Sequence, residues 1–245
     1  MTVIAHLSDP HLDGSSQRLR RFRAVLEQVA DLPELDAVLI SGDLADHGAA
    51  NEYEQLFDTL PRALPILAVP GNHDLAGPLL DALGRYGFPA TLNTTLDVVD
   101  VRLIGLDSHR DQHDEGALAP AALVYAREQL AGTQSPVILA LHHPPVPVGH
   151  RVMDRFGLRN TDDLAELVRT HDNIIGIFTG HVHTALATIY AGVPLLGAPG
   201  IVSTMRLGGR IDPIADPDAM PGFAVHAITG TTISTVFHYL SPSAL

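Results

Sequence analysis

The sequence of 245 residues contains no cysteine, no lysine and no tryptophan. Without cysteine there can be no disulfide, and any bound metal ion must be held by nitrogen and oxygen ligands. Without lysine, no ε-amino group can act as a base, as a Schiff-base nucleophile or as a phosphate-binding cation. All fifteen basic side chains are therefore arginine. The 14 histidines are a high count for a chain without tryptophan, so their positions in the sequence matter.

Long apolar runs are also missing. No run approaches the roughly 20 residues that cross a bilayer, so we expect no membrane span. Residues 1–9 lack the basic start and the cleavage site of a signal peptide, which favours a cytoplasmic protein. The formal net charge of −13 disfavours a nucleic-acid polymer as a partner.

Apolar residues make up 46% of the chain, which is typical of a folded globular protein. Their spacing predicts strands at 3–8, 37–41, 66–69, 137–141 and 174–178, and helices at 18–31, near 51–60, at 79–86, near 120–131 and at 161–171. Thr161 is the expected N-cap of the last helix. A hairpin is expected at 96–99 and 101–106, further strands at 185–190, 193–196, 223–228 and 232–239, and one long loop at 207–222. This order predicts a layered α/β sandwich with helices outside, in a single domain over residues 1–245.

Five of the predicted strands are each followed by a short polar motif. The motifs are S-D-P-H at 8–11, G-D-L-A-D at 42–46, G-N-H-D at 71–74, H-H-P-P at 142–145 and G-H-V-H at 180–183. In open α/β sheets, ligands bind beyond the carboxyl ends of the strands. We therefore expect the five motifs to converge on one place.

Each motif alone has an ordinary explanation. D-x-H arises by chance, G-D and G-N-H-D suit tight turns, and H-H-P-P can simply end a strand. Chance is a poor explanation for all five motifs at five strand ends in this order. Carboxylates, an amide and imidazoles without thiolates suit Mn, Fe, Zn, Co or Ni. Seven candidate ligands exceed the needs of one ion, whereas two ions sharing a carboxylate would use them all.

The ordered set of motifs resembles the calcineurin-like metallophosphoesterase superfamily over residues 9–183. Within it, H-H-P-P and the short chain resemble the bacterial class III cyclic-nucleotide phosphodiesterases and their glycerophosphodiesterase relatives. The resemblance implies a four-layer α/β/β/α sandwich of two mixed β-sheets flanked by helices. It also implies two metal ions per chain, with Fe and/or Mn expected and Zn or Co as alternatives. A homodimer is common among the relatives.

The resemblance also implies the role of each motif residue. Asp9, His11 and His183 would bind one ion, Asp43 would bridge both, and Asn72, His142 and His181 would complete the second site. A bridging hydroxide would attack phosphorus. His73 would face the leaving-group oxygen as a proton donor or electrostatic stabiliser, and Asp46 would orient His73. Asp74 is the local competitor for that orienting role.

The remaining histidines have simpler explanations. His143 follows a predicted ligand, but strand alternation should turn its side chain away. Eight others match no motif position and are expected to be ordinary surface or packed residues: His6, His47, His109, His113, His150, His171, His226 and His238.

The function predicted is hydrolysis of a small phosphodiester, with 3′,5′-cyclic AMP as the first candidate. A glycerophosphodiesterase or a phosphomonoesterase on the same core is the alternative, and the loops near 109–118, 145–160 and 200–222 would decide between them. A DNA nuclease would need a basic groove, which the net charge of −13 opposes. A non-catalytic scaffold of this fold would be expected to lose motif residues, and here all are present.

Overall fold

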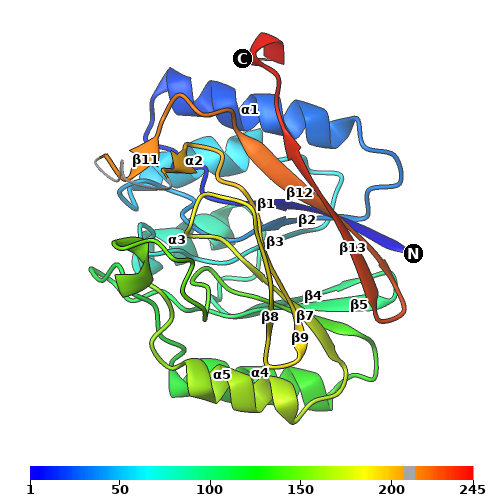
Figure 1. The fold of residues 1–245 in the computed structure, drawn as a ribbon. Coiled ribbons are helices and arrows are strands. Elements are labelled where there is room, and N and C mark those ends of the chain that lie inside the picture. The colour runs from blue at the N-terminus through cyan, green and yellow to red at the C-terminus, as the bar shows by residue number, and fades with distance from the viewer. Residues whose placement is uncertain (207–212, 245) are drawn as a thin grey trace.

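The computed structural model describes residues 1–206 and 213–244 as four layers, two β-sheets between two layers of helices (Figure 1). This confirms the α/β/β/α sandwich of two mixed sheets. Part of the predicted loop at 207–222, residues 207–212, lies outside the described residues.

The first sheet has the strand order β13-β12-β1-β2-β3. Its strands β1 (Thr2–Leu7), β2 (Ala37–Ile40) and β3 (Ile66–Ala68) are parallel, and β12 (Gly222–Thr229) and β13 (Thr232–Tyr239) extend it antiparallel. Helices α1 (Ser16–Ala30), α2 (Ala50–Thr59) and α3 (Ala76–Arg85) pack their apolar faces on its outer side. The three parallel strands therefore end at one edge of the sheet.

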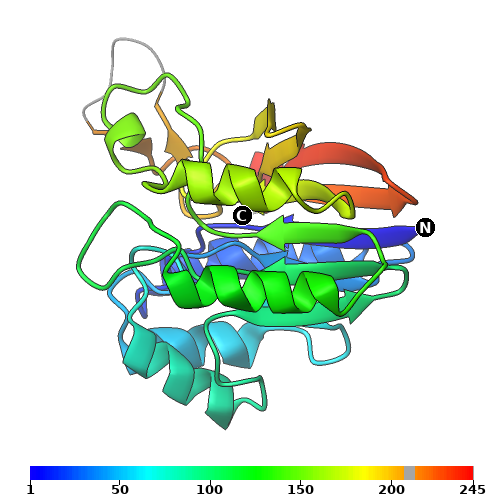
Figure 2. The ribbon, with the colours of Figure 1, turned by 90° about the horizontal axis from the view of Figure 1, so that it is seen from below.

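The second sheet has the order β4-β5-β6-β7-β9-β8. Its parallel strands are β5 (Val101–Gly105), β6 (Val137–Ala140), β7 (Ile174–Thr179) and β9 (Val193–Gly197), with β4 (Thr94–Val98) and β8 (Leu186–Tyr190) antiparallel at the edges. Helices α4 (Pro120–Ala131) and α5 (Thr161–Arg169) cover its outer side (Figure 2).

A shared apolar core joins the two sheets. Ile4, Leu39 and Leu67 of the first sheet pack there with Ile138 and Phe178 of the second. All five are almost fully buried, and each such side chain contributes about 1.5–3 kcal/mol to the free energy of unfolding.

The loops beyond the strands of the two sheets also touch directly. A Cβ atom on Gly180, after β7, would lie 2.1 Å from Ser8 Oγ and 2.6 Å from the Ser41 carbonyl oxygen. Only glycine allows this approach, which brings the loops after β1, β2 and β7 together.

Three details differ from the sequence-based prediction. The N-cap of α5 is Asn160, and Thr161 is the first helical residue. Within the predicted loop at 207–222, Ala215–Asp216 (β11) pairs with Thr204–Met205 (β10). Short 3₁₀ turns at Met153–Arg155 (η1) and Pro242–Ala244 (η2) were not predicted. Two-residue strands and single turns carry too little periodicity to be read from a sequence.

None of the helices in residues 1–206 and 213–244 combines the length and the apolar character that a bilayer crossing requires.

Candidate metal centre

Five of the predicted site residues have an unusual backbone conformation. Asp9, His11, Asp43, His181 and His183 all have positive φ, between 43° and 69°. Non-glycine residues rarely adopt this left-handed region, and where they do the surrounding structure must hold them there. These backbone conformations direct side chains from three short loops toward one point.

One half of the site is formed by Asp9, His11, Asp43 and His183, whose ligand atoms lie within 4.8 Å of one another. His11 Nε2 lies 3.1 Å from His183 Nε2 and 3.2 Å from Asp43 Oδ2. His183 Nε2 lies 3.4 Å from Asp9 Oδ1. This half contains the residues predicted for the first ion.

The other half is centred on Asn72. Asn72 Oδ1 lies 3.1 Å from His142 Nε2 and 3.0 Å from His181 Nδ1. His142 Nε2 is also 3.4 Å from Asp43 Oδ2. Asp43 Oδ2 therefore lies between the two halves, where a bridging ligand would be, while its Oδ1 accepts a hydrogen bond from the His73 backbone N–H at 2.8 Å.

The donor set fits divalent cations, because lone pairs face lone pairs. The Nδ1–H of His142 donates to the Ser41 carbonyl oxygen at 2.7 Å, so the Nε2 of the neutral ring carries a lone pair. That lone pair faces the oxygens of Asn72 and Asp43. His11 repeats the arrangement, since its Nδ1–H donates to Asp46 Oδ1 at 2.9 Å. Such a cage of acceptors needs a positive charge at its centre, which a metal ion or bound protons can supply.

The pKa values of His11 and His142 also show that the cage favours bound positive charge. Burial would lower the pKa of His11, but Asp43, Asp46 and Asp9 raise it to about 10. Burial also opposes protonation of His142, but Asp43 and Asp9 favour it and raise the pKa of His142 to about 9. Without metal the cage therefore takes up protons, which metal binding would displace.

His73 lies at the rim of the cage. Its side chain is 42% exposed and its ring packs edge-on against the ring of His11, with centroids 4.5 Å apart. The Nδ1–H donates to the backbone carbonyl oxygen of Asp46 at 2.8 Å, whereas the nearer Asp46 carboxylate oxygen is 3.8 Å away. Nε2 of His73 is thereby left for a ligand.

The Asp46 carboxylate has other partners. Its Oδ1 accepts hydrogen bonds from His11 Nδ1–H at 2.9 Å and from Arg18 at 2.7 Å. Arg18 also donates to the His11 carbonyl oxygen at 2.7 Å. Burial would raise the pKa of Asp46, but His11 and Arg18 lower it strongly. Asp46 thus holds His11 by its side chain and His73 by its main chain.

Asp74 has a different position from its sequence neighbour His73. It is fully buried, and its carboxylate accepts backbone N–H bonds from Leu44, Ala45 and Gly71 at 2.8–3.1 Å. It fastens the loop after β3 to the loop after β2.

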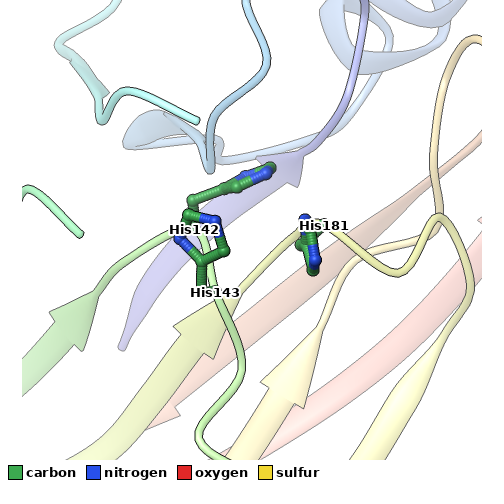
Figure 3. Close-up of side chains that lie close together, drawn as sticks. All are labelled: His142, His143 and His181. Carbon is green, nitrogen blue, oxygen red and sulfur yellow. The ribbon is translucent and has the colours of Figure 1, made fainter. Parts of the chain in front are cut away.

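The expectation that the His143 side chain turns away is wrong. Its ring lies beside those of His142 and His181, with centroids 4.9 and 4.7 Å away (Figure 3). The chain leaves extended geometry after β6, so strand alternation does not apply at this position. His143 Nδ1 bonds Ser108 Oγ at 2.9 Å. Within residues 1–206 and 213–244, the Nε2 atoms of His143 and His181 have no hydrogen-bond partner.

Several supporting residues were not predicted from the sequence. Ser203 Oγ lies 2.7 Å from His183 Nδ1, and Ser8 Oγ donates to Asp9 Oδ2 at 2.5 Å. Arg21, buried against the loop after β9, donates to the carbonyl oxygens of Ile201 and Ala219. Only Ser8, inside the S-D-P-H motif, had a sequence signal.

Three cavities are lined by histidines of the centre, a small one of about 60 Å³ and two larger ones. One, of about 400 Å³, is polar and is lined by His11, Arg18, Asp46, His183 and Ser203 among others. The other, of about 250 Å³, is bounded by Pro144–Leu158 loop residues, including Val146 and Met153, and reaches His181. A ligand in the first of these would touch His183, and a ligand in the second would touch His181.

Comparison with known proteins decides the family. The model of the family described as calcineurin-like phosphoesterase matches residues 2–185, more than half of the chain. The chain belongs to the calcineurin-like phosphoesterase family. The predicted resemblance is confirmed, and so is the class of enzyme, a metal-dependent phosphoesterase.

Curated relatives of this phosphoesterase have two kinds of name. A probable cyclic nucleotide phosphodiesterase of Synechococcus is 32% identical over 67% of the chain and 64% of its own length. The cAMP/cGMP dual specificity phosphodiesterase of Mycobacterium tuberculosis is 30% identical over 96% of the chain and 78% of its own length. The glycerophosphodiester phosphodiesterase GpdQ of Enterobacter lignolyticus is 30% identical over 82% of the chain and 77% of its own length.

Solved structures show that the fold is shared more widely than the sequence. A dimetal phosphatase from Danio rerio has a TM-score of 0.67 at 13% identity, covering 98% of this chain and 99% of that one. At this identity the likeness concerns the fold of the phosphoesterase alone.

Proposed function

We propose that this phosphoesterase is a dinuclear metal phosphodiesterase that hydrolyses a small phosphodiester, with 3′,5′-cyclic AMP as the substrate. The main support for two metal ions is the position of Asp43, whose Oδ2 lies 3.2 Å from His11 Nε2 and 3.4 Å from His142 Nε2. One carboxylate oxygen therefore serves both halves of the cage. The relatives named as cyclic nucleotide phosphodiesterases support the choice of substrate.

Asp9, His11, Asp43 and His183 would hold one ion, and Asp43, Asn72, His142 and His181 the other. Divalent ions in such a site make water nucleophilic at neutral pH and neutralise the phosphoryl oxygens during in-line attack. Hard and borderline ligands suit Fe and Mn, with Zn or Co as alternatives.

The chain itself supplies the proton for the leaving group. His73 Nδ1–H is fixed on the Asp46 carbonyl, so a second proton on His73 is carried by the exposed Nε2. There it can be given to the departing ester oxygen, a transfer typically worth 10²–10⁴-fold in rate. Arg18 and Asp46 keep His11 beneath the His73 ring.

Glycerophosphodiesters are the alternative substrates, supported by the likeness to GpdQ. A phosphomonoester on the same core is a further alternative. We also propose that residues 1–245 form one domain, that the enzyme is cytoplasmic, and that a homodimer is its assembly.

The test is hydrolysis by protein reconstituted with Mn²⁺. Hydrolysis of cyclic AMP, a glycerophosphodiester and a phosphomonoester is measured for the wild type, for His73→Ala and for the control His238→Ala, which removes an exposed histidine on β13. Cyclic AMP turnover that is lost in His73→Ala and kept in His238→Ala supports the proposal. Turnover of only the other esters would exclude cyclic AMP as the substrate but would still support a metal-dependent phosphoesterase. No hydrolysis by metal-loaded protein would favour a scaffold.

A further inference from the structure

Two histidines outside every motif lie in the apolar core between the sheets. His6 on β1 and His226 on β12 are fully buried, and both rings stack on Phe178, with centroids 5.4 and 3.9 Å away. Polar groups buried among apolar side chains cost free energy unless every polar atom is bonded. All four ring nitrogens have hydrogen-bond partners, so the burial of the two rings leaves none of these nitrogens unpaired.

The partners form one continuous chain that reaches the metal centre. Thr235 Oγ1 lies 2.8 Å from His226 Nδ1, and His226 Nε2 lies 3.1 Å from His6 Nδ1. His6 Nε2 lies 2.9 Å from Ser41 Oγ.

From there the chain continues through two hydroxyl groups. Ser41 Oγ lies 2.7 Å from Ser8 Oγ, and Ser8 Oγ lies 2.5 Å from Asp9 Oδ2. The chain thus runs from a partly exposed hydroxyl on the outer strand β13 to a candidate metal ligand.

The carboxylate at the end fixes the direction of each bond as far as His6. Asp9 can only accept, so Ser8 must donate to it and must accept from Ser41. The Ser41 hydroxyl proton is then used in the bond to Ser8, so Ser41 Oγ must accept from His6 Nε2. This requires a proton on Nε2 of His6. In a neutral His6 ring, Nδ1 is then an acceptor, so His226 carries its proton on Nε2.

The arrangement with His6 Nδ1 as the acceptor requires both imidazoles to be neutral. Burial agrees with this requirement, because it lowers the pKa of His6 to about 3 and that of His226 well below the ordinary value.

We propose that His6 and His226 are positioning residues, which act as neutral Nε2–H tautomers to hold the Ser8 hydroxyl as a donor to Asp9 Oδ2. The inference rests on the proposed metal centre. With Oδ2 occupied, Oδ1 faces the cage, where it accepts from the His181 backbone N–H at 3.2 Å and lies 3.4 Å from His183 Nε2. The chain thereby selects which oxygen of Asp9 is offered to a metal ion.

The tautomers can be measured without any metal or activity. Long-range ¹H–¹⁵N correlation spectra of metal-free protein at neutral pH should show the Nε2–H pattern for both His6 and His226. An Nδ1–H pattern for either ring, or a doubly protonated ring, would overturn the proposal. Failure of the proposed catalytic function would leave this result unaffected.

The positioning role is tested by Mn²⁺ affinity. His226→Phe keeps an aromatic ring on Phe178 but removes the donor to His6, and it should weaken Mn²⁺ binding about tenfold, as loss of outer-shell partners does. His226→Gln retains an N–H donor and should stay near wild type. His238→Phe, at an exposed position of β13, is the matched control.

A folded His226→Phe variant with wild-type Mn²⁺ affinity would contradict the positioning role. If His226→Phe does not fold, the tautomer spectrum of the wild-type protein decides alone.

Discussion

Asp46 and Asp74 are two motif carboxylates with separate roles. Asp46 accepts hydrogen bonds from the side chains of His11 and Arg18, whereas Asp74 accepts three backbone N–H bonds. From the sequence alone, either carboxylate could orient His73, because each lies within a motif. Only the folded loops show that Asp46 meets His73, and that it does so through its carbonyl oxygen.

Asp74→Ala should therefore act on stability. It leaves three buried N–H groups without their acceptor, and an unsatisfied buried donor costs about 1–3 kcal/mol. Urea unfolding should show a loss of about 3 kcal/mol or more. Asp74→Asn, which keeps one acceptor oxygen, should lose less. Equal stability of Asp74→Ala and wild type would refute this role.

The buried His6 predicts a pH dependence of stability. Its pKa is about 3 in the folded protein and ordinary, 6.5, in the unfolded chain. Between these values only the unfolded chain binds the proton, so stability falls as pH decreases. From pH 7 to 5 this residue should cost about 2 kcal/mol. In chelator, His6→Gln should lose less stability than wild type by about that amount; identical losses would exclude the assignment.

At the scale of elements, the parallel strands and their carboxyl-end motifs could be predicted from the sequence. Apolar runs mark β1, β2, β6 and β7, and the motif that follows each run places its side chains at one edge. The left-handed φ angles of Asp9 and His181 could not be predicted, because these residue types usually adopt φ below zero. Nor could the inward position of His143, which depends on where β6 ends.

The loop after β3 offers a paired test of close packing. A Cβ on Gly71 would lie 2.2 Å from Asp43 Oδ1 and 2.3 Å from the Asp43 backbone nitrogen, whereas one on Gly84 in α3 would meet Ala90 Cβ at 3.8 Å, an ordinary contact distance. Gly71→Ala should displace Asp43 and abolish tight Mn²⁺ binding. Gly84→Ala should bind normally and unfold at the same or a higher temperature, since alanine favours helix by about 0.5–1 kcal/mol. Normal Mn²⁺ binding by Gly71→Ala would show that the loop does not position Asp43.

At the scale of the whole molecule, the metal centre joins the two sheets at one edge of their shared core. His11 and Asp43 follow strands of the first sheet, and His142, His181 and His183 follow strands of the second. Two divalent ions would also reduce the formal net charge from −13 to about −9. Metal should therefore stabilise the pairing of the sheets as well as enable catalysis.

Removal of metal should lower the melting temperature. At 100 times its Kd, a ligand adds about 2.7 kcal/mol, which is about 5–10 °C for a chain of this length. Calorimetry with Mn²⁺, with chelator, and with Mn²⁺ restored measures the shift. An unchanged melting temperature after verified metal removal would mean that the centre contributes nothing to the fold.

The most direct test of the account is an anomalous difference map from a crystal grown with Mn²⁺. We predict two peaks about 3.5–4 Å apart, as in two-metal sites, one on either side of Asp43 Oδ2. One peak should touch His11 and His183, and the other Asn72 and His142. A single peak, or two peaks away from Asp43, would contradict the dinuclear centre.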